Sequence, residues 1–476
     1  MLGIQHFSTA RHMLSTARIA SPLRRPALWR GSAGLSSRSS ADTRLKRPKQ
    51  PSRPTITAMI KEAGDYNSIL DIVESHARRL NPIHLTATWT ALSKLSEHKA
   101  VIRRHEQFKL LMEISEQSFG ISEFTGQELA LVAHSAAKLQ GDARGELKEF
   151  FHSLADTSVS KMATFAPREM SITAWAFASS RQAQKPLFDA LAREAISKMD
   201  EFKAQDISNM AWAFATAKIA APELFEQLAS AAISKVDDFA PQGLANMAWA
   251  FATAGQKPRK LFSAIGNSAA ERAPDCKPRE LANLAWAFAT IEQNAAKMFN
   301  AFAEEAVQRA DTFNDHDLVI TTWAFATIGF RSEEFYEAMA ATSRLRASAF
   351  TPKALSLAVT AFQRARHPVA RFFAQKLEAL TARTAKGRRS SLSAVGSYGQ
   401  TRPAADDRRP SDGAGRTRGH GGNGNGGRVY QGADHAWPDH LLQEGKRNSF
   451  YPDGDEASAT RWKKARRKVV DKDSGW

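Results

Sequence analysis

Apolar residues recur through the middle of the chain with the spacing of amphipathic α-helices. In residues 241–254, Leu244, Met247 and Phe251 fall within about 100° of one another on a helical projection, the width of a stripe that packs on a partner helix. A second helix is predicted where a Leu-Phe pair precedes spaced apolar residues, as in Leu224, Phe225, Leu228, Ala232 and Ile233. Since no alternating runs of Val, Ile, Thr and Tyr occur here, the pattern predicts pairs of helices and no strands.

This paired pattern returns every 37 residues. The segment Ala-Trp-Ala-Phe-Ala-Thr and its close variants mark the register with a tryptophan column: Trp175, Trp212, Trp249, Trp286 and Trp323. Weaker units centred on Trp89, His134 and Thr360 extend the array to eight. A fixed period of about 20 to 50 residues is typical of stacked-repeat proteins, whose terminal repeats are often degenerate. The sequence therefore predicts an all-α fold, an α-solenoid of about eight two-helix repeats.

The ends of the first helix of each unit are also marked. Proline recurs at its first turn, where a missing N–H costs nothing: Pro167, Pro241, Pro278 and Pro352. An acid follows two positions later in several units, near the positive end of the helix dipole: Glu169, Asp206, Glu280 and Asp317. Gly255 and Gly329 are expected to end their helices. Cys276 takes a slot that phenylalanine holds in other units, so we expect it to fill the core.

Charge divides the chain into three parts. Residues 1–56 carry eleven Lys and Arg and one acid, residues 57–380 carry 36 bases and 37 acids, and residues 381–476 carry nineteen bases and eleven acids. The first part is rich in Arg and Ser, which is typical of an organellar transit peptide, although a disordered basic tail is the alternative. We expect the middle part to be the helical domain, and the destination to be the mitochondrion, with the plastid as the alternative.

The last part, residues 381–476, is rich in Gly, Ser, Pro and Arg, and we expect it to be disordered. Arg416, Arg418 and Arg428 lie among glycines, as in arginine-glycine segments that bind RNA weakly. Residues 461–468 form a basic cluster with one tryptophan, which suits either an RNA contact or a nuclear localisation signal. The transit-like N-terminus favours the RNA contact.

A second stripe runs along the first helix of each unit, away from its apolar stripe. In one unit it comprises Gln242, Asn246, Trp249 and Thr253, which lie within about 60° of one another. The tryptophans could stack on bases or pack between units, and their flanking alanines favour packing. The asparagines could bind base edges or link neighbouring helices. The column at the helix starts could meet phosphates or form a solvated polar face.

The stripe supplies the candidate RNA-binding residues. They are Arg168, Gln205, Asn209, Thr216, Gln242, Asn246, Thr253, Arg279, Asn283, Thr290, His316, Thr327 and Lys353. If each unit reads one base, the three identical Asn/Thr pairs would favour three like bases in a row.

Enzymatic chemistry has little support in the sequence. No nucleophile–base pair and no spacing of metal ligands stands out, and the glycines of 419–427 lack the Gly-Lys-Ser/Thr ending of a phosphate-binding loop. The single cysteine excludes a disulfide framework. The sequence contains no run of about 20 apolar residues, so we expect no transmembrane helix. We therefore expect a protein without catalytic residues, cofactor or metal, and with neither membrane nor DNA as a partner.

The repeat itself resembles known families. Leu-Ala-Asn-Met-Ala-Trp-Ala-Phe-Ala-Thr-Ala-Gly at 244–255 and its counterpart at 281–290 resemble octatricopeptide repeats, the helical repeats of FAST-kinase-domain proteins, and those of the kinetoplastid RNA-editing substrate-binding complex. The resemblance covers about residues 80–380. It implies an α-solenoid that binds single-stranded organellar RNA as a non-catalytic adaptor in its processing, editing, stability or translation. The alternative is a protein-binding scaffold subunit of an organellar ribonucleoprotein complex.

Overall fold

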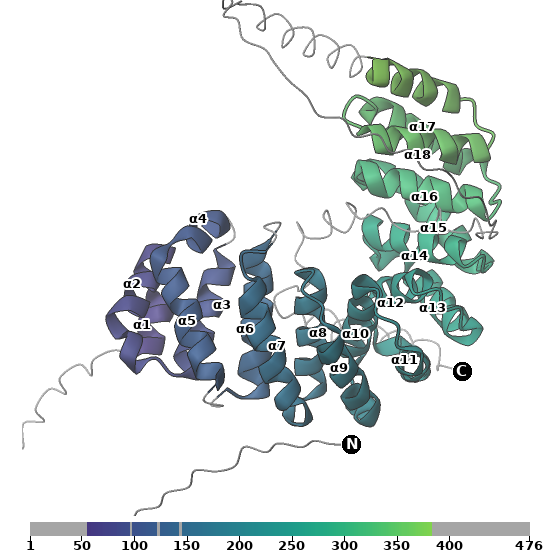
Figure 1. Cartoon of the computed structure of the whole chain (residues 1–476). Helices are drawn as coiled ribbons and strands as arrows, with labels where there is room; N and C mark the ends of the chain where they lie inside the picture. Colours follow the sequence, from purple (N-terminus) through teal and green to yellow (C-terminus); the bar gives the residue numbers. More distant parts are fainter. Residues whose placement is uncertain (1–54, 96–97, 121–123, 142–144, 383–476) are drawn as a thin grey trace, which may run out of the picture. The chain divides into compact units, whose positions relative to one another are not determined.

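The computed structural model of the chain describes residues 55–95, 98–120, 124–141 and 145–382 (Figure 1). Within these ranges the chain forms α-helices and short 3-10 turns and contains no β-strand. The predicted all-α solenoid is confirmed. Nearly all of the predicted transit peptide and of the predicted basic tail lies outside the described residues.

The helices alternate between two series that form two layers. The A helices, each packed on the next of its own series, are α1 (Ile56–Glu62), α3 (Pro82–Lys94), α6 (Gly126–Gln140), α8 (Pro167–Ser179), α10 (Ala204–Ala217), α12 (Pro241–Thr253), α14 (Pro278–Thr290), α16 (Asp315–Thr327) and α18 (Pro352–Arg364). The B helices are α2 (Tyr66–His76), α5 (Glu106–Gly120), α7 (Lys148–Ser160), α9 (Lys185–Ser197), α11 (Pro222–Ser234), α13 (Arg259–Glu271), α15 (Ala296–Gln308), α17 (Glu333–Arg346) and a helix of residues 370–382. A short helix, α4 (Lys99–Arg104), precedes α5.

All eight predicted units are present, from α3 to the helix of residues 370–382. The pair α1–α2 precedes them and packs on α3. Sequence reasoning missed this pair because it carries neither the tryptophan nor the alanine-rich segment that defines the register. Its helices are instead marked by side-chain caps, Thr55 on α1 and Asp65 on α2.

The ends of the A helices follow local chemistry. Proline occupies the first turn of α8, α12, α14 and α18. The Glu169 carboxylate accepts from the Ala166 backbone N–H at 2.8 Å, and Glu280 does the same for Lys277 at 2.8 Å, so these acids serve as caps. Gly255 and Gly329 have φ of 70° and 72°, the left-handed conformation that glycine adopts without strain. The same slot holds larger residues in four other units, Arg181, Lys218, Glu292 and Arg366.

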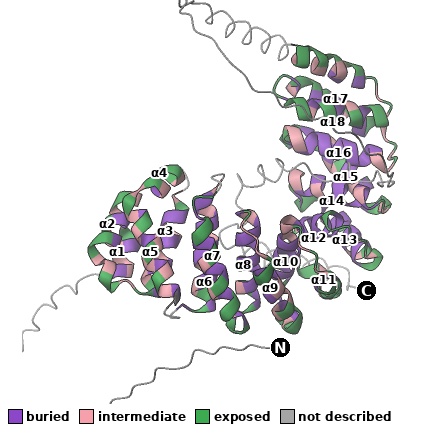
Figure 2. Ribbon diagram, viewed as in Figure 1, coloured by how far each residue is buried: buried purple, intermediate pink, exposed green. Residues whose placement is uncertain are grey.

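The core lies between the layers and between successive A helices. Phenylalanines of five B helices, α7, α9, α11, α13 and α15, meet the phenylalanine of the next A helix edge to face, as in Phe188–Phe214, with ring centroids 4.9 Å apart, and Phe225–Phe251, 5.0 Å apart. The A helices are mostly buried, whereas the B helices keep an exposed face (Figure 2). Nine of the thirteen residues of α12 are buried, against five of thirteen in α11.

A basic side chain at the end of six B helices, α7 to α17, ties successive units together. This basic column repeats every 37 residues and consists of Lys161, Lys198, Lys235, Arg272, Arg309 and Arg346. Lys198 Nζ donates to the Phe165 carbonyl at 2.9 Å, and Lys235 Nζ to the Phe202 carbonyl at 2.6 Å. Each contact supplies a partner to a carbonyl in the turn of the preceding unit. Sequence reasoning did not single out this column.

Candidate nucleic-acid interface

The tryptophan column forms a ladder between units. The ring centroids of Trp175 and Trp212 are 6.5 Å apart, and those of Trp212 and Trp249 are 6.4 Å apart. His134, in the tryptophan slot of an earlier unit, lies 5.2 Å from Trp175. Trp212 is half-buried, and the others of the column are 4% to 8% exposed. The structure thus favours the packing interpretation, because little of each indole face is open to a base.

Two of the candidate asparagines are also enclosed. Asn209 and Asn246 are each 6% exposed, while Asn283 is half-buried. Although the helical projection places both on the side away from the apolar stripe, Asn209 and Asn246 are not open to solvent. An A helix has a neighbouring A helix on both sides, and small residues such as Ala211 and Ala213 let those neighbours come close. A projection of one helix against one partner could not show the second neighbour.

The remaining candidates lie at the two ends of the A helices. At the starts, the N-terminal row has three exposed members, Arg168, Gln205 and Lys353, and three half-buried ones, Gln242, Arg279 and His316. At the other ends, the C-terminal row has Thr253 exposed and Thr216, Thr290 and Thr327 half-buried. Eleven residues of helix separate Gln242 from Thr253, or about 16 Å. The candidates therefore form two rows with the tryptophan column between them, rather than one stripe.

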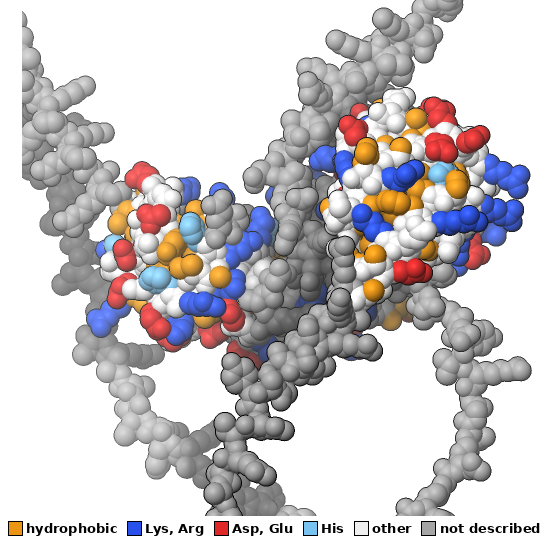
Figure 3. Space-filling model, turned by 90° about the horizontal axis from the view of Figure 1, so that it is seen from above, with side chains coloured by type: hydrophobic (Ala, Val, Ile, Leu, Met, Phe, Trp, Pro, Cys, Tyr) orange, Lys and Arg blue, Asp and Glu red, His pale blue; other side chains and the backbone are white. Residues whose placement is uncertain are grey.

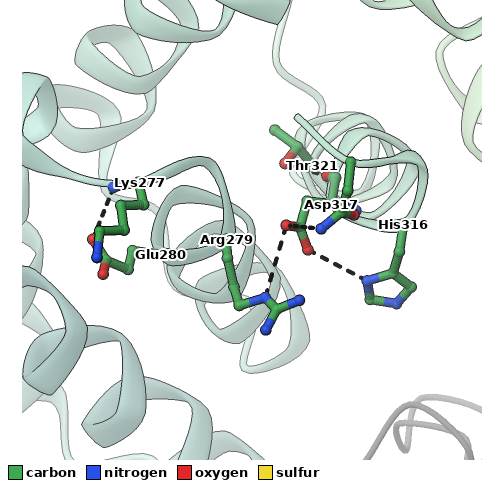
Figure 4. A network of polar contacts seen from close by, with 7 residues as sticks. Lys277, Arg279, Glu280, His316, Asp317 and Thr321 are labelled. Carbon is green, nitrogen blue, oxygen red and sulfur yellow. Dashed lines mark hydrogen bonds and ion pairs between the residues drawn. The ribbon is translucent and has the colours of Figure 1, made fainter. Parts of the chain in front are cut away.

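Part of the N-terminal row is engaged by a buried carboxylate (Figure 4). Asp317 of α16 is 3% exposed and accepts from Asn314 Nδ2 at 2.7 Å. Its carboxylate also faces Arg279 Nε of α14 at 3.9 Å and His316 Nδ1 at 3.4 Å. Two candidate RNA-binding residues of adjacent units thus converge on one acid, which offsets some of the positive charge of Arg279.

Two further acids lie behind the same row. Asp206 is 7% exposed and accepts from Ser171 Oγ of the preceding A helix at 3.1 Å. Burial raises the pKa of Asp206 and that of Glu280, against the opposing effect of the backbone N–H that each accepts from. The row therefore rests on carboxylates that cap helices, and only its exposed members, such as Arg168 and Gln205, are open to a ligand.

The C-terminal row changes chemistry in the last unit. Arg364 takes the slot that Thr327 and its equivalents hold in earlier units. Its Nη1 donates to Thr327 Oγ1 at 2.7 Å, and its guanidinium carbon lies 6.0 Å from the centre of the Trp323 ring. The tryptophan column therefore ends under an exposed arginine.

Because burial disfavours the protonated form of His134, we expect the protein to lose stability in acid. Burial, and then the charge of Lys138, lowers the pKa of His134 to about 4. As pH falls from about 6.5 towards 4, the unfolded chain binds a proton that the native chain does not, so the free energy of unfolding decreases. We expect this residue to contribute a loss of about 2 kcal/mol between pH 7 and pH 4.5.

Urea denaturation at the two pH values measures this loss. The matched variant His134→Phe keeps a ring in the slot but cannot titrate, so its stability should fall by about 2 kcal/mol less than that of the wild type over the same interval. Equal losses in both proteins would contradict the assignment.

The described residues offer no metal centre. Within them, no group of three or more His, Cys, Asp or Glu side chains is arranged to hold a metal ion. Cys276 is 1% exposed, and burial raises the pKa of its thiol to about 12, as expected of a core residue. None of the helices in the described part of the chain is long and apolar enough to cross a membrane.

Comparison with known proteins places part of this array in a family context. Residues 108–296 match the family model of the RNA-editing substrate-binding complex 6 protein. The match runs from α5 to the first residue of α15 and so includes the central A helices. No curated protein matches the chain. Of the three resemblances suggested by the repeat, the match supports the one to the RNA-editing substrate-binding complex; the other two stay predictions.

Proposed function

We propose that this protein is a non-catalytic RNA-binding adaptor in an organellar RNA-processing complex, with the mitochondrion as its compartment and the plastid as the alternative. The observation that carries the proposal is the match of residues 108–296 to a family named for an RNA-editing substrate-binding complex. The ligand that we propose is single-stranded RNA, bound together with protein partners of the same complex.

The arrangement of the A helices supports a polymeric ligand. From α6 to α18, each unit places polar side chains at equivalent positions near both ends of its A helix, so the stack offers similar chemistry at regular steps. Such extended surfaces suit chain-like ligands better than compact substrates. The exposed members of the N-terminal row also lie at helix starts, where backbone N–H groups and the helix dipole favour anions such as phosphate.

The absence of catalysis is part of the proposal. Acidic side chains at the helix starts are engaged in structural contacts, such as the cap of Glu280 and the contacts of the Asp317 carboxylate. Incubation of end-labelled RNA with the purified full chain and Mg²⁺ should leave the RNA intact. A defined cleavage or modification product that grows with protein concentration would contradict a non-catalytic role.

One observation favours a scaffold function as the second candidate. Val159, Ile196 and Ile233 form an apolar row on α7, α9 and α11, each 36% or 37% exposed and spaced by 37 residues. Apolar side chains in a line on the exposed face of the B helices are suited to protein contacts. Partners that stay bound to the full chain after RNase treatment, and are lost in Ile196→Ser, would support the scaffold function.

We expect substitutions of exposed and of buried candidate residues to have different effects on RNA binding. Replacing Arg168, which is exposed, with Gln should lower the slope of log affinity against log salt by about 0.7, the value for one phosphate contact on a single strand. Replacing Asn246, which is 6% exposed, with Ala should leave the affinity within about twofold. Fluorescence anisotropy of a labelled oligouridine at several salt concentrations measures both.

Two results would contradict these expectations. A lost affinity in Asn246→Ala with an unchanged melting temperature would show that the amide reads a base despite its burial. Absence of RNA binding by the wild-type chain at low salt would reject the proposed function.

A further inference from the structure

The C-terminal end of the stack differs in charge from the rest of it. Residues 338–382 carry seven Lys and Arg and a single acid, Glu378. Residues 57–337 carry 29 bases and 36 acids. A helical region that is neutral as a whole therefore consists of an acidic array and a strongly basic end.

In the described part of the chain, the last unit has no following unit to cover its outer face, which explains why this surface is polar. Lys376 takes a slot that is buried and apolar in five earlier units, held by Leu191, Leu228, Ile265, Phe302 and Met339. Thr360 takes the tryptophan slot. No further unit follows in the described residues, and a terminal repeat keeps its protein soluble by presenting a polar outer face.

The requirement for a polar outer face does not explain why the surface is basic. The opposite end, residues 55–80, carries three bases and four acids, so a charge-balanced surface serves there. Concentrating charges of one sign costs repulsion, which mixed charges would avoid. The excess of bases at the C-terminal end therefore points to a ligand that is negatively charged.

The arrangement of these side chains fits a nucleic acid better than an isolated anion. Phe372 is half-buried, although its slot is fully buried in earlier units, as by Leu187. The Arg344 guanidinium carbon lies 5.3 Å from the Phe372 ring centre, and Lys376 Nζ lies 5.8 Å from it. The adjacent Leu345 is 84% exposed. Cations beside accessible apolar and aromatic groups are typical of surfaces for single strands.

Further exposed bases lie close by in the sequence. Arg364, Arg366 and Arg371 are exposed, whereas Arg346 is engaged with the carbonyls of Phe313 and Asp311. In Figure 3, this end faces the viewer at the right, where Lys and Arg side chains lie around exposed hydrophobic ones. Residues 383–389, which follow directly, add four more Lys and Arg to the sequence.

We propose that this end of the stack, the basic cap of residues 338–382, binds the phosphate backbone of single-stranded RNA through Arg344, Arg366 and Arg371, with Phe372 and Leu345 contacting bases. The inference rests on the proposed function, in that it locates the main electrostatic contact of the same ligand. It shifts that contact from the central A helices to a unit outside the matched residues 108–296.

The test compares two triple variants of the full chain with the same change in charge. In the cap variant, Arg344→Gln, Arg366→Gln and Arg371→Gln are combined; in the control, Lys61→Gln, Arg78→Gln and Arg79→Gln change exposed residues at the opposite end. Binding of a labelled oligouridine is measured by anisotropy over a range of salt. We expect the cap variant to lose about tenfold in affinity and about 2 in salt slope, and the control less than about twofold in affinity.

Each outcome has a distinct meaning. Equal losses in the two variants, or no loss in the cap variant, would overturn the inference while leaving the proposed function intact. Retained RNA affinity with loss of a bound acidic protein would assign the cap to that protein and also overturn it. Failure of the wild type to bind RNA would reject the proposed function itself.

Folding is controlled separately, because Arg344 contacts Phe372. Melting temperatures of the wild type and both variants are compared. The double variant Arg366→Gln and Arg371→Gln leaves that contact in place and should still lose about 1.4 in salt slope. An unchanged slope in the double variant would count against the cap.

Discussion

Replacing Phe251 with alanine is expected to lower the free energy of unfolding by about 3 to 5 kcal/mol. Phe251 of α12 is 1% exposed and meets Phe225 of α11 edge to face, with ring centroids 5.0 Å apart. The substitution leaves a cavity between two units in the middle of the array. Because a unit of a solenoid is held mainly by its neighbours, a weak central interface should lower the cooperativity of the whole stack.

Equilibrium denaturation in urea, followed by circular dichroism, measures this effect. Thr253→Ala is the matched control, because Thr253 is exposed at the end of the same helix and its loss should cost no more than about 0.5 kcal/mol. Similar losses in the two variants would contradict the view that the phenylalanines hold consecutive units together.

Replacing Arg272 with alanine is expected to cost about 2 to 4 kcal/mol. Arg272 is 4% exposed, and its guanidinium donates to the carbonyls of Phe239, Val236 and Ser268. Burial lowers the pKa of this side chain, but arginine stays charged at neutral pH. Alanine would leave a space and would deprive carbonyls of the preceding turn of their partner.

Lysines at equivalent positions of the basic column suggest the control variant. Lys198 and Lys235 make the equivalent contact in earlier units, so Arg272→Lys should cost less than about 1 kcal/mol. The two variants are compared by their urea midpoints. If lysine destabilises the protein as much as alanine does, the contact depends on the shape of the guanidinium and not on a cation that reaches the carbonyl.

The architecture could be predicted from the sequence because its determinants recur. Phenylalanine, alanine and the N-terminal proline recur at equivalent positions of successive units, so a period of 37 residues revealed the helix pairs from α3 onwards, but not the pair α1–α2 that precedes them. Gly255 and Gly329 also marked helix ends correctly. In Arg181 and Lys218 the same left-handed conformation is held by residues that give no such signal.

The candidate site could be predicted only in part. A lysine or arginine on an amphipathic helix is usually solvated, so Lys198 and Arg272 gave no sign that they reach the carbonyls of another unit. Burial of Asn209 arises from neighbouring helices on both sides, which a single-helix projection omits. The basic cap was hidden because the charge of residues 57–380 sums to nearly zero.

These features suggest a division of labour along the chain. In the central units the tryptophans pack in a column between A helices, and the basic column donates to carbonyls of the preceding turn. The exposed members of the N-terminal row and the basic cap provide the proposed contacts with RNA. A substitution in the stack should therefore act through stability, and one in the cap through affinity and its dependence on salt.

We expect the folded stack itself, and not only the segments outside it, to contact RNA. Photo-crosslinking of the full chain to an RNA that contains 4-thiouridine, with the attached peptides mapped by mass spectrometry, tests it most directly. We expect crosslinks in α17, α18 and the helix of residues 370–382, with others at the starts of α8 and α10. Crosslinks confined to residues 1–54 and 383–476 would contradict it.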